Sequence, residues 1–170
     1  VARLRRRALL PRPGTEVMLN VQRRSGRGAC GYHRPEESTQ TMAKRSDIIS
    51  SSASPVMNLF RKGLLHGAGY DTDRFAARPL IAIANSHTEL TTGHSHLDRL
   101  AQKVREGIVA AGGECAEFNV PAPCDGVAMA HDGMRFVLAQ RDLIADMLET
   151  HLRSQPYDGV VFIAGCDKIN

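Results

Sequence analysis

Three short apolar segments alternate with two longer amphipathic segments along the second half of the chain. The apolar segments are "RPLIAIAN" (78–85), "ECAEFNV" (114–120) and "GVVFIAG" (159–165). Short apolar runs that are bounded by Gly or Pro are typical of buried strands. Each of the three segments is therefore predicted to form a strand.

The two amphipathic segments lie between these strands and are predicted to be helices. In "SHLDRLAQKVREGIVAAGG" (95–113), apolar residues recur at helical spacing, with Ser95 as candidate N-cap and Gly112-Gly113 as the end signal. In "GMRFVLAQRDLIADMLETHLRSQ" (133–155), the predicted apolar stripe consists of Leu138, Leu143, Ile144, Met147, Leu148 and Leu152.

The alternation of strands and helices predicts the fold class, which is α/β with a parallel sheet and flanking helices. Continuous apolar strands are expected where helices cover both faces of the sheet. Ligands of such sheets bind outside the carboxyl ends of the strands. Three loops leave those ends, at residues 85–96, 121–134 and 166–170, and they hold most of the chemically unusual side chains.

Residues 1–54 lack this periodicity and are predicted to form a disordered tail before an α/β domain at residues 55–170. Residues 1–41 carry a net charge of +6, whereas residues 42–170 carry −2. An Arg-rich start is typical of a nucleic-acid-binding arm or an organellar presequence. We interpret it more simply as a solvated tail, or as a non-native upstream extension with Met42 as the true start.

Composition and cysteine spacing narrow the class of protein further. No apolar run approaches the roughly 20 residues that cross a bilayer, and no secretory leader is visible. We therefore expect a cytoplasmic protein with no membrane contact, and the acidic residues 42–170 give no reason to expect nucleic acid. The four cysteines are widely spaced without a C-x-x-C pair, which argues against a disulfide framework or a zinc ribbon.

Two Cys-Asp pairs follow predicted strands, in Cys124-Asp125-Gly126 and in Cys166-Asp167-Lys168. A thiolate is a soft ligand suited to an iron–sulfur cluster or zinc, and a carboxylate is a hard ligand suited to magnesium. The simpler interpretation is that both cysteines are packing residues and that Asp125 caps the next helix. The repeated pair at neighbouring strand ends also predicts a metal site.

The loop at residues 85–96 contributes Glu89, His94 and His96. The simpler interpretation is that one of the two histidines caps a helix or faces solvent, and the functional alternative is that one of them binds a substrate carboxylate or hydroxyl. His94 and Cys124 are additional candidates for metal binding. Arg135 is interpreted as a partner in a helix-surface ion pair rather than as a binder of an acidic substrate.

Three long stretches of the chain carry a family resemblance. They are "NSHTELTTGHSHLDRLAQKVREGIVAAGGECAEFNV" (85–120), "CDGVAMAHDGMRFVLAQRDLIADMLE" (124–149) and "YDGVVFIAGCDKI" (157–169). They closely resemble the N-terminal part of the dihydroxy-acid and sugar-acid dehydratase family, in register from about Pro55 to Ile169. The resemblance implies the N-terminal part of a larger two-domain enzyme, homodimeric at full length.

The resemblance also implies an activity and its cofactors. Family members are hydro-lyases that remove water from a 2,3-dihydroxy carboxylic acid to give a 2-keto acid, using an iron–sulfur cluster and Mg²⁺. By position, Cys166 resembles a cluster ligand, and Asp125 and Asp167 resemble magnesium ligands. Lys168 resembles a catalytic-site lysine that many members carry in carboxylated form as a further magnesium ligand.

Two features depart from the family pattern. Gly93 stands where many members have a cluster cysteine, and the Gly-His form found here is often linked with a four-iron cluster, so both [2Fe–2S] and [4Fe–4S] stay open. Family chains also run on for several hundred residues, with further ligands and a base. We therefore expect this polypeptide alone to be an inactive fragment.

The substrate and the class of protein have alternatives. The leading hypothesis is a dihydroxy-acid dehydratase of branched-chain amino acid biosynthesis, and "GVAMAHDGM" favours it. The same-class alternative is a dehydratase of an aldonate or 6-phosphogluconate, which "VPAPCDG" favours. An alternative of a different class is a basic-tailed nucleic-acid-binding module, whose binding would be salt-sensitive and would require residues 1–41.

Overall fold

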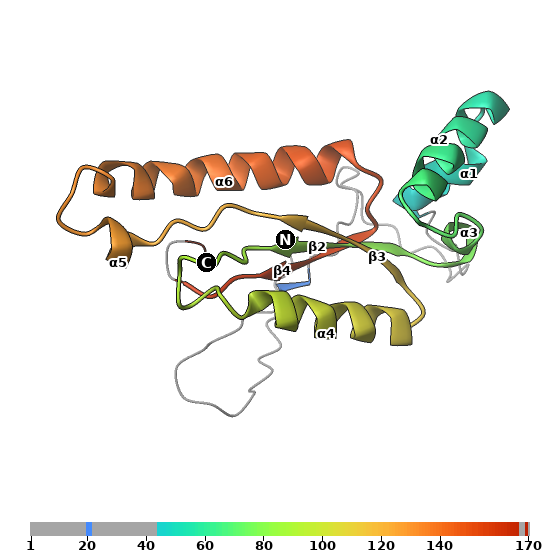
Figure 1. Ribbon diagram of the computed structural model, residues 1–170. Helices are drawn as coiled ribbons and strands as arrows, with labels where there is room; N and C mark the ends of the chain where they lie inside the picture. Colours follow the sequence, from blue (N-terminus) through green and yellow to red (C-terminus); the bar gives the residue numbers. More distant parts are fainter. Residues whose placement is uncertain (1–19, 22–43, 167–168, 170) are drawn as a thin grey trace, which may run out of the picture.

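The protein is described by a computed structural model that covers residues 20–21, 44–166 and 169. Its centre is a sheet in the strand order β1-β4-β2-β3. β2 (Leu80–Asn85) is parallel both to β3 (Glu114–Asn119) and to β4 (Gly159–Ile163), and the short β1 (Asn20–Val21) pairs antiparallel with β4. The predicted parallel α/β sheet is confirmed (Figure 1).

Helices cover both faces of this sheet. α4 (Leu97–Ala110) lies on one face and α6 (Met134–Ser154) on the other (Figure 1). The remaining helical elements are short or peripheral: η1 (Arg45–Asp47), α1 (Ile48–Ser51), α2 (Pro55–Gly67), α3 (Arg74–Ala77) and α5 (Asp125–Ala128). Both long helices were predicted within a few residues of their observed bounds.

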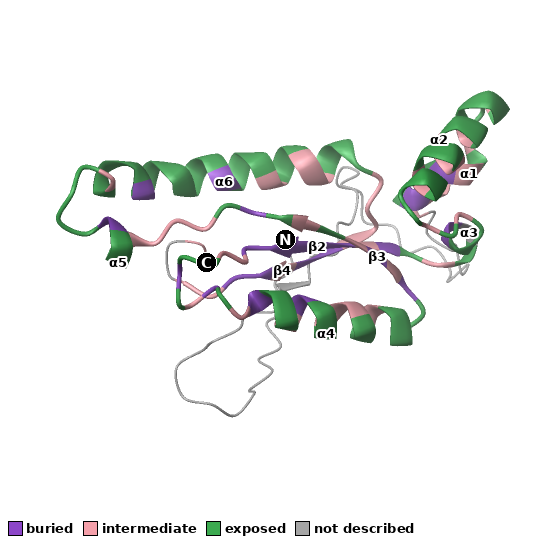
Figure 2. Ribbon diagram, in the orientation of Figure 1, coloured by how far each residue is buried: buried purple, intermediate pink, exposed green. Residues whose placement is uncertain are grey.

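The core consists of two apolar layers, one on each face of the sheet, because successive strand residues point to opposite faces. The layer under α4 contains Ile83, Leu97, Ala101, Cys115, Val161 and Ile163. The layer under α6 contains Ala82, Ala84, Val120, Ile144 and Val160. Figure 2 shows the buried residues concentrated in β2 and β4.

The start of α4 differs from its predicted form. The N-cap is His96 rather than Ser95, and the Ser95 hydroxyl donates instead to the Thr92 carbonyl at 3.3 Å. The end of the helix was predicted correctly, because Gly112 has a φ of +83°, a left-handed conformation that favours glycine.

The apolar stripe predicted for α6 is only half correct. Ile144 is buried, and Leu148 and Leu152 pack beside it against the sheet. Leu138, Leu143 and Met147 are at least half exposed. The physical reason is that Ile144, Leu148 and Leu152 are spaced four apart and share the side of the helix that faces the sheet, whereas the other three residues lie on other sides.

Residues 44–54 form η1, α1 and the entry to α2, so the tail boundary expected at residue 54 differs from the structure. Ser46 is fully buried, and its backbone N–H and hydroxyl donate to the Asp158 carboxylate at 3.0 Å and 2.6 Å. Leu80 N–H donates to the same carboxylate at 2.7 Å. This carboxylate joins the segment to the sheet. Apart from β1, the expected tail at residues 1–41 lies outside the described residues.

Much of the outer surface of the peripheral helices is apolar. α2 buries none of its residues, and Val56, Leu59, Phe60 and Leu64 are more than half exposed. In the part of the chain that the structure describes, no helix combines the length and the apolar character needed to span a membrane.

Candidate functional site

The three loops singled out in the sequence leave the same edge of the sheet. Asn85, at the end of β2, is in register with Asn119 at the end of β3 and with Ile163 at the end of β4. Figure 1 shows the loop before α4 and the segment around α5 at this end of the molecule. The parallel register therefore brings the starts of the three loops to one edge of the sheet.

His94 is fixed inside the first of these loops by Ser86. Its side chain is completely buried, and its Nδ1 lies 2.7 Å from the Ser86 carbonyl oxygen and 3.0 Å from the Ser86 hydroxyl. The Ser86 hydroxyl itself donates to the Ile163 carbonyl at 2.8 Å. A carbonyl can only accept, so Nδ1 carries a hydrogen, and in this tautomer of imidazole Nε2 is the acceptor. Of the two histidines in this loop, His96 occupies the N-cap position of α4, as the simpler interpretation expected, whereas His94 is buried.

Two buried polar atoms in this loop have no hydrogen-bond partner. Among the described residues, the buried side-chain atoms in this state are Thr91 Oγ1 and His94 Nε2. An unpaired buried polar atom costs about 1–3 kcal/mol, so such atoms are rare in native proteins and call for a ligand or another functional reason. Both atoms lie in the loop where the sequence predicted binding chemistry.

Glycines let this loop touch the end of β4. A Cβ built on Gly165 would overlap the Gly93 carbonyl oxygen, and it would lie 3.7 Å from His94 Cδ2. A Cβ built on Gly93 would lie 3.6 Å from Cys166 Sγ, which is ordinary contact. Gly93-His94 is thus directly apposed to Gly165-Cys166.

The structure describes some of the cysteine and aspartate candidates in the other two loops, namely Cys124, Asp125 and Cys166. Cys115, Cys124 and Cys166 are thiols rather than disulfides, and Cys124 and Cys166 are half-buried. Asp167 and Lys168 lie outside the described residues, so the structure does not test their predicted roles. The described residues contain no group of three or more His, Cys, Asp or Glu side chains placed to hold a metal.

Cys124 and Asp125 begin the short helix α5. Cys124 occupies the N-cap position without a side-chain cap bond, and Asp125 is the first helical residue. The alternative in which Asp125 caps this helix is therefore wrong. Asp125 is half-buried at the loop edge, where its carboxylate could act as a hard ligand.

The remaining candidates have ordinary surface or packing roles. Glu89 is exposed, and Arg135 forms an exposed ion pair with Asp132 at 3.3 Å, as predicted. Cys115 lies in the core under α4, and burial raises the pKa of its thiol, so it is a packing residue rather than a thiolate ligand.

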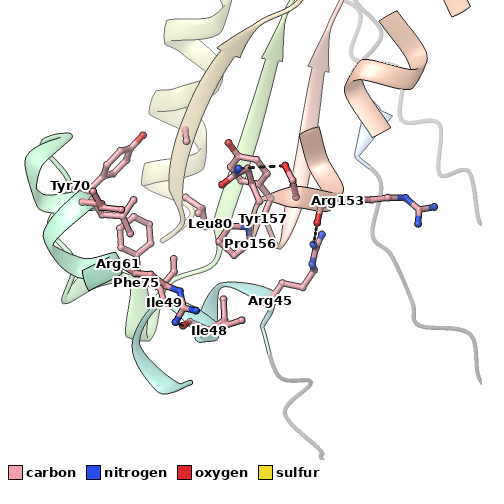
Figure 3. Close-up of a pocket in the computed structure, with 15 residues that line it drawn as sticks. Arg45, Ile48, Ile49, Arg61, Tyr70, Phe75, Leu80, Arg153, Pro156 and Tyr157 are labelled. Carbon is pink, nitrogen blue, oxygen red and sulfur yellow. Dashed lines mark hydrogen bonds between the residues drawn. The ribbon is translucent and has the colours of Figure 1, made fainter. Parts of the chain in front are cut away.

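A cavity of about 710 Å³ lies at the opposite edge of the sheet. Its lining includes Leu80, the first residue of β2, and Tyr157, which precedes β4 (Figure 3). Arg45 donates from this cavity to the carbonyls of Leu152 and Arg153 at 3.2 Å and 3.1 Å, at the end of α6. As far as the described residues show, the cavity contains none of the candidate metal ligands.

Sequence reasoning missed three residues of the site. Ser86 and Thr91 gave no signal beyond being polar, and Gly165 appeared to be only the end of a strand. A polar "NS" directly after an apolar strand could have drawn attention to Ser86, because Asn85 and Ser86 are both buried.

Comparisons with known proteins show the family of the chain. The family model described as "Dihydroxy-acid/6-phosphogluconate dehydratase N-terminal" matches residues 78–170. A dihydroxy-acid dehydratase of Ruminiclostridium cellulolyticum is 45% identical over 125 residues, which are 74% of this chain and 22% of that protein. The corresponding enzyme of Caldicellulosiruptor bescii is 48% identical over 127 residues, with 74% and 22% covered.

A third relative comes from an archaeon. The dihydroxy-acid dehydratase of Methanococcus aeolicus is 44% identical over 124 residues, which are 73% of this chain and 22% of that protein. The chain thus spans about a fifth of the length of the curated relatives that it matches. The chain belongs to the dihydroxy-acid/6-phosphogluconate dehydratase N-terminal family.

Proposed function

We propose that this chain forms the N-terminal part of a hydro-lyase that converts a 2,3-dihydroxy carboxylic acid into a 2-keto acid. The structural observation that carries the proposal is the apposition of Gly93-His94 and Gly165-Cys166 at the carboxyl edge of a parallel sheet. Family membership and the names of the relatives support the same reaction.

The donors at this edge fit an iron–sulfur cluster and Mg²⁺. A half-buried thiol at Cys166 lies beside Gly93, where a Cβ would make only ordinary contact, and the next residue, His94, has an imidazole nitrogen without a hydrogen-bond partner among the described residues. We assign Cys166 to the cluster and Asp125, Asp167 and Lys168 to magnesium, with Cys124 as an additional candidate. When bound, these groups supply Lewis acidity at the departing hydroxyl and at the substrate oxygens.

The protein residues hold and orient the site. The hydrogen bonds that join Ser86 to His94 and to Ile163 hold the first loop against the end of β4, near Cys166. The substrate loses its C2 proton and C3 hydroxyl as water, and the resulting enol becomes a 2-keto acid without any oxidant. We place the base and further ligands outside this chain, and so expect the chain alone to have no dehydratase activity.

The substrate and setting follow from the same proposal. The relatives' names favour a dihydroxy acid of branched-chain amino acid biosynthesis over an aldonate or 6-phosphogluconate. We further propose that the longer enzyme is a cytoplasmic homodimer that binds a small hydroxy acid, and neither nucleic acid nor membrane.

A chimera tests the proposed function. Residues 44–170 would replace the matching segment of the Caldicellulosiruptor bescii relative, and keto-acid formation would be measured from 2,3-dihydroxy-3-methylbutanoate, gluconate and 6-phosphogluconate. We expect turnover of the dihydroxy acid. Asp125→Asn should reduce it by at least about a hundredfold, because it removes an anionic ligand. The exposed Asp146→Asn is the matched control and should retain full activity.

The outcomes separate the alternatives. If the chimera converts only gluconate or 6-phosphogluconate, the dihydroxy-acid substrate is wrong and the sugar-acid dehydratase alternative is correct. A folded chimera that contains iron and sulfide but converts none of the three acids would contradict the proposal.

A further inference from the structure

We propose that His94 Nε2 is an iron ligand that acts beside the Cys166 thiolate, at the place where Gly93 offers no side chain. This inference rests on the proposed function, because it specifies one ligand of the cluster assigned there. The iron would then have two kinds of protein ligand, the sulfur of Cys166 from the loop after β4 and the Nε2 nitrogen of His94 from the loop after β2.

The first step is the protonation state of the ring. The Ser86 carbonyl accepts from Nδ1 at 2.7 Å, and the Ser86 hydroxyl is already a donor to Ile163 at 2.8 Å. Nδ1 must therefore carry the hydrogen, which leaves the lone pair on Nε2. A metal-binding histidine usually has this second hydrogen bond, because it fixes the tautomer and the ring orientation.

The second step is the lack of any other role for Nε2. His94 is completely buried, and Nε2 has no hydrogen-bond partner among the described residues. Buried polar groups are generally paired with a protein group or with ordered water, and no protein group among the described residues takes this role at Nε2. The protein instead holds one nitrogen firmly and leaves the other available.

The third step is direction. Nδ1 and Cδ2 lie on opposite sides of the ring, and Cδ2, the carbon bonded to Nε2, is the ring atom near Gly165. The Cδ2 side of the ring, which is the side away from Nδ1, therefore lies toward Gly165, the residue that precedes Cys166. At the same contact, the Cβ position of Gly93 lies 3.6 Å from Cys166 Sγ.

The fourth step is chemical substitution. A cysteine at position 93 would place a second sulfur beside Cys166, but this chain has glycine there and a histidine immediately after it. Imidazole nitrogen replaces thiolate as an iron ligand in some iron–sulfur centres. His94 is the side chain next to this gap with an available donor atom.

Cobalt(II) binding by the 170-residue chain tests the inference without any activity assay. Co²⁺ accepts thiolate and imidazole ligands, and thiolate binding produces a near-ultraviolet charge-transfer band. We expect this band to saturate with added Co²⁺ and to disappear in Cys166→Ser. We also expect one histidine Nδ1–H proton resonance to move far outside the diamagnetic range, because that proton is buried and bonded to Ser86.

His94→Asn is the decisive variant, because the Asn side-chain nitrogen can take the place of Nδ1 and keep the bond to Ser86. It should retain the amide spectrum of the folded chain, lose the shifted histidine resonance and weaken Co²⁺ binding by more than about tenfold. Adding Gly93→Cys to this variant should restore binding and strengthen the thiolate band. His131→Asn, at an exposed histidine outside this contact, is the control and should change neither signal.

The outcomes distinguish this inference from the proposed function. A Cys166-dependent band without a shifted histidine resonance, and with unchanged affinity in His94→Asn, would overturn the His94 assignment and leave that of Cys166 intact. The absence of any thiolate band would overturn both.

Discussion

Cys166 lies directly beside Gly93, so that a Cβ at position 93 would be 3.6 Å from the Cys166 sulfur. These residues are far apart in the sequence, and they meet because β2 and β4 are parallel neighbours whose carboxyl ends coincide. Gly93, which directly precedes His94, thus lies against the thiol of Cys166, the residue assigned to the cluster.

Gly93→Cys should therefore form a disulfide with Cys166 in the absence of metal. The position suits a bridge, because a sulfur carried by a Cβ at position 93 would lie close to the Cys166 sulfur, and the S–S bond of a disulfide is about 2 Å long. Treatment with diamide should remove two reactive thiols from each molecule, and peptide mapping should find residues 93 and 166 linked. Gly107→Cys, where a Cβ would meet nothing within 4 Å, is the control and should not link to Cys166. A 93 variant that stays reduced would contradict the observed contact.

Gly165→Ala should separate the two loops. Its Cβ would overlap the Gly93 carbonyl, so the backbone must shift, at an expected cost of about 1–3 kcal/mol in the free energy of unfolding. Urea denaturation measures this cost. Gly107→Ala is the matched substitution at an exposed position of α4. It should be neutral or should stabilise the fold by up to about 1 kcal/mol. Equal effects of the two substitutions would show that the glycines do not bring the loops together.

The elements with a clear period could be predicted from the sequence. Apolar runs such as "LIAIA" predict buried strands, and their alternation with amphipathic segments leaves few topologies besides a right-handed parallel sheet. The edge that carries Cys124 and Cys166 follows from that topology alone. Confirmation of the sheet therefore also confirms the edge at which the loops start.

Contacts between distant residues could not be predicted in this way. Nothing in a periodic pattern indicates that Ser86 anchors His94, or that Gly93 and Gly165 touch, because these depend on loop geometry. The tail boundary was misjudged because Ser46 appears in a Ser-rich stretch, and its carboxylate partner Asp158 lies at the other end of the domain.

Asp158→Asn should loosen residues 44–54 from the sheet. The Asp158 carboxylate accepts from Ser46 N–H, Ser46 Oγ–H and Leu80 N–H, and an amide offers only one acceptor oxygen. We expect a loss of about 1–3 kcal/mol in the free energy of unfolding, with faster amide exchange at Ser46 and Leu80. The exposed Asp142→Asn should change neither quantity. Unaltered exchange at Ser46 in Asp158→Asn would contradict the proposed anchoring role.

The buried thiol of Cys115 should make stability fall in alkaline solution. Burial raises its pKa above the ordinary value of 9.0, whereas the unfolded chain titrates near that value. The unfolded state therefore loses the thiol proton at a lower pH than the folded state does. The contribution of Cys115 to the free energy of unfolding is consequently complete below pH 9, and it is lost as pH rises through the pKa of the folded state. Comparing Cys115→Ala with the parent between about pH 8 and pH 10 should show a shallower decline in the variant. Identical slopes would contradict the effect.

Manganese(II) relaxation in the 170-residue chain tests most directly whether the loops after β3 and β4 form one metal site. Mn²⁺ accepts the same oxygen ligands as Mg²⁺ and broadens amide resonances close to it. We predict that the amides of Asp125, Gly126, Gly165 and Cys166 broaden together at one saturable Mn²⁺ concentration, and that Asp125→Asn abolishes the effect at all four. Broadening confined to one loop, or broadening that persists in Asp125→Asn, would contradict a shared site.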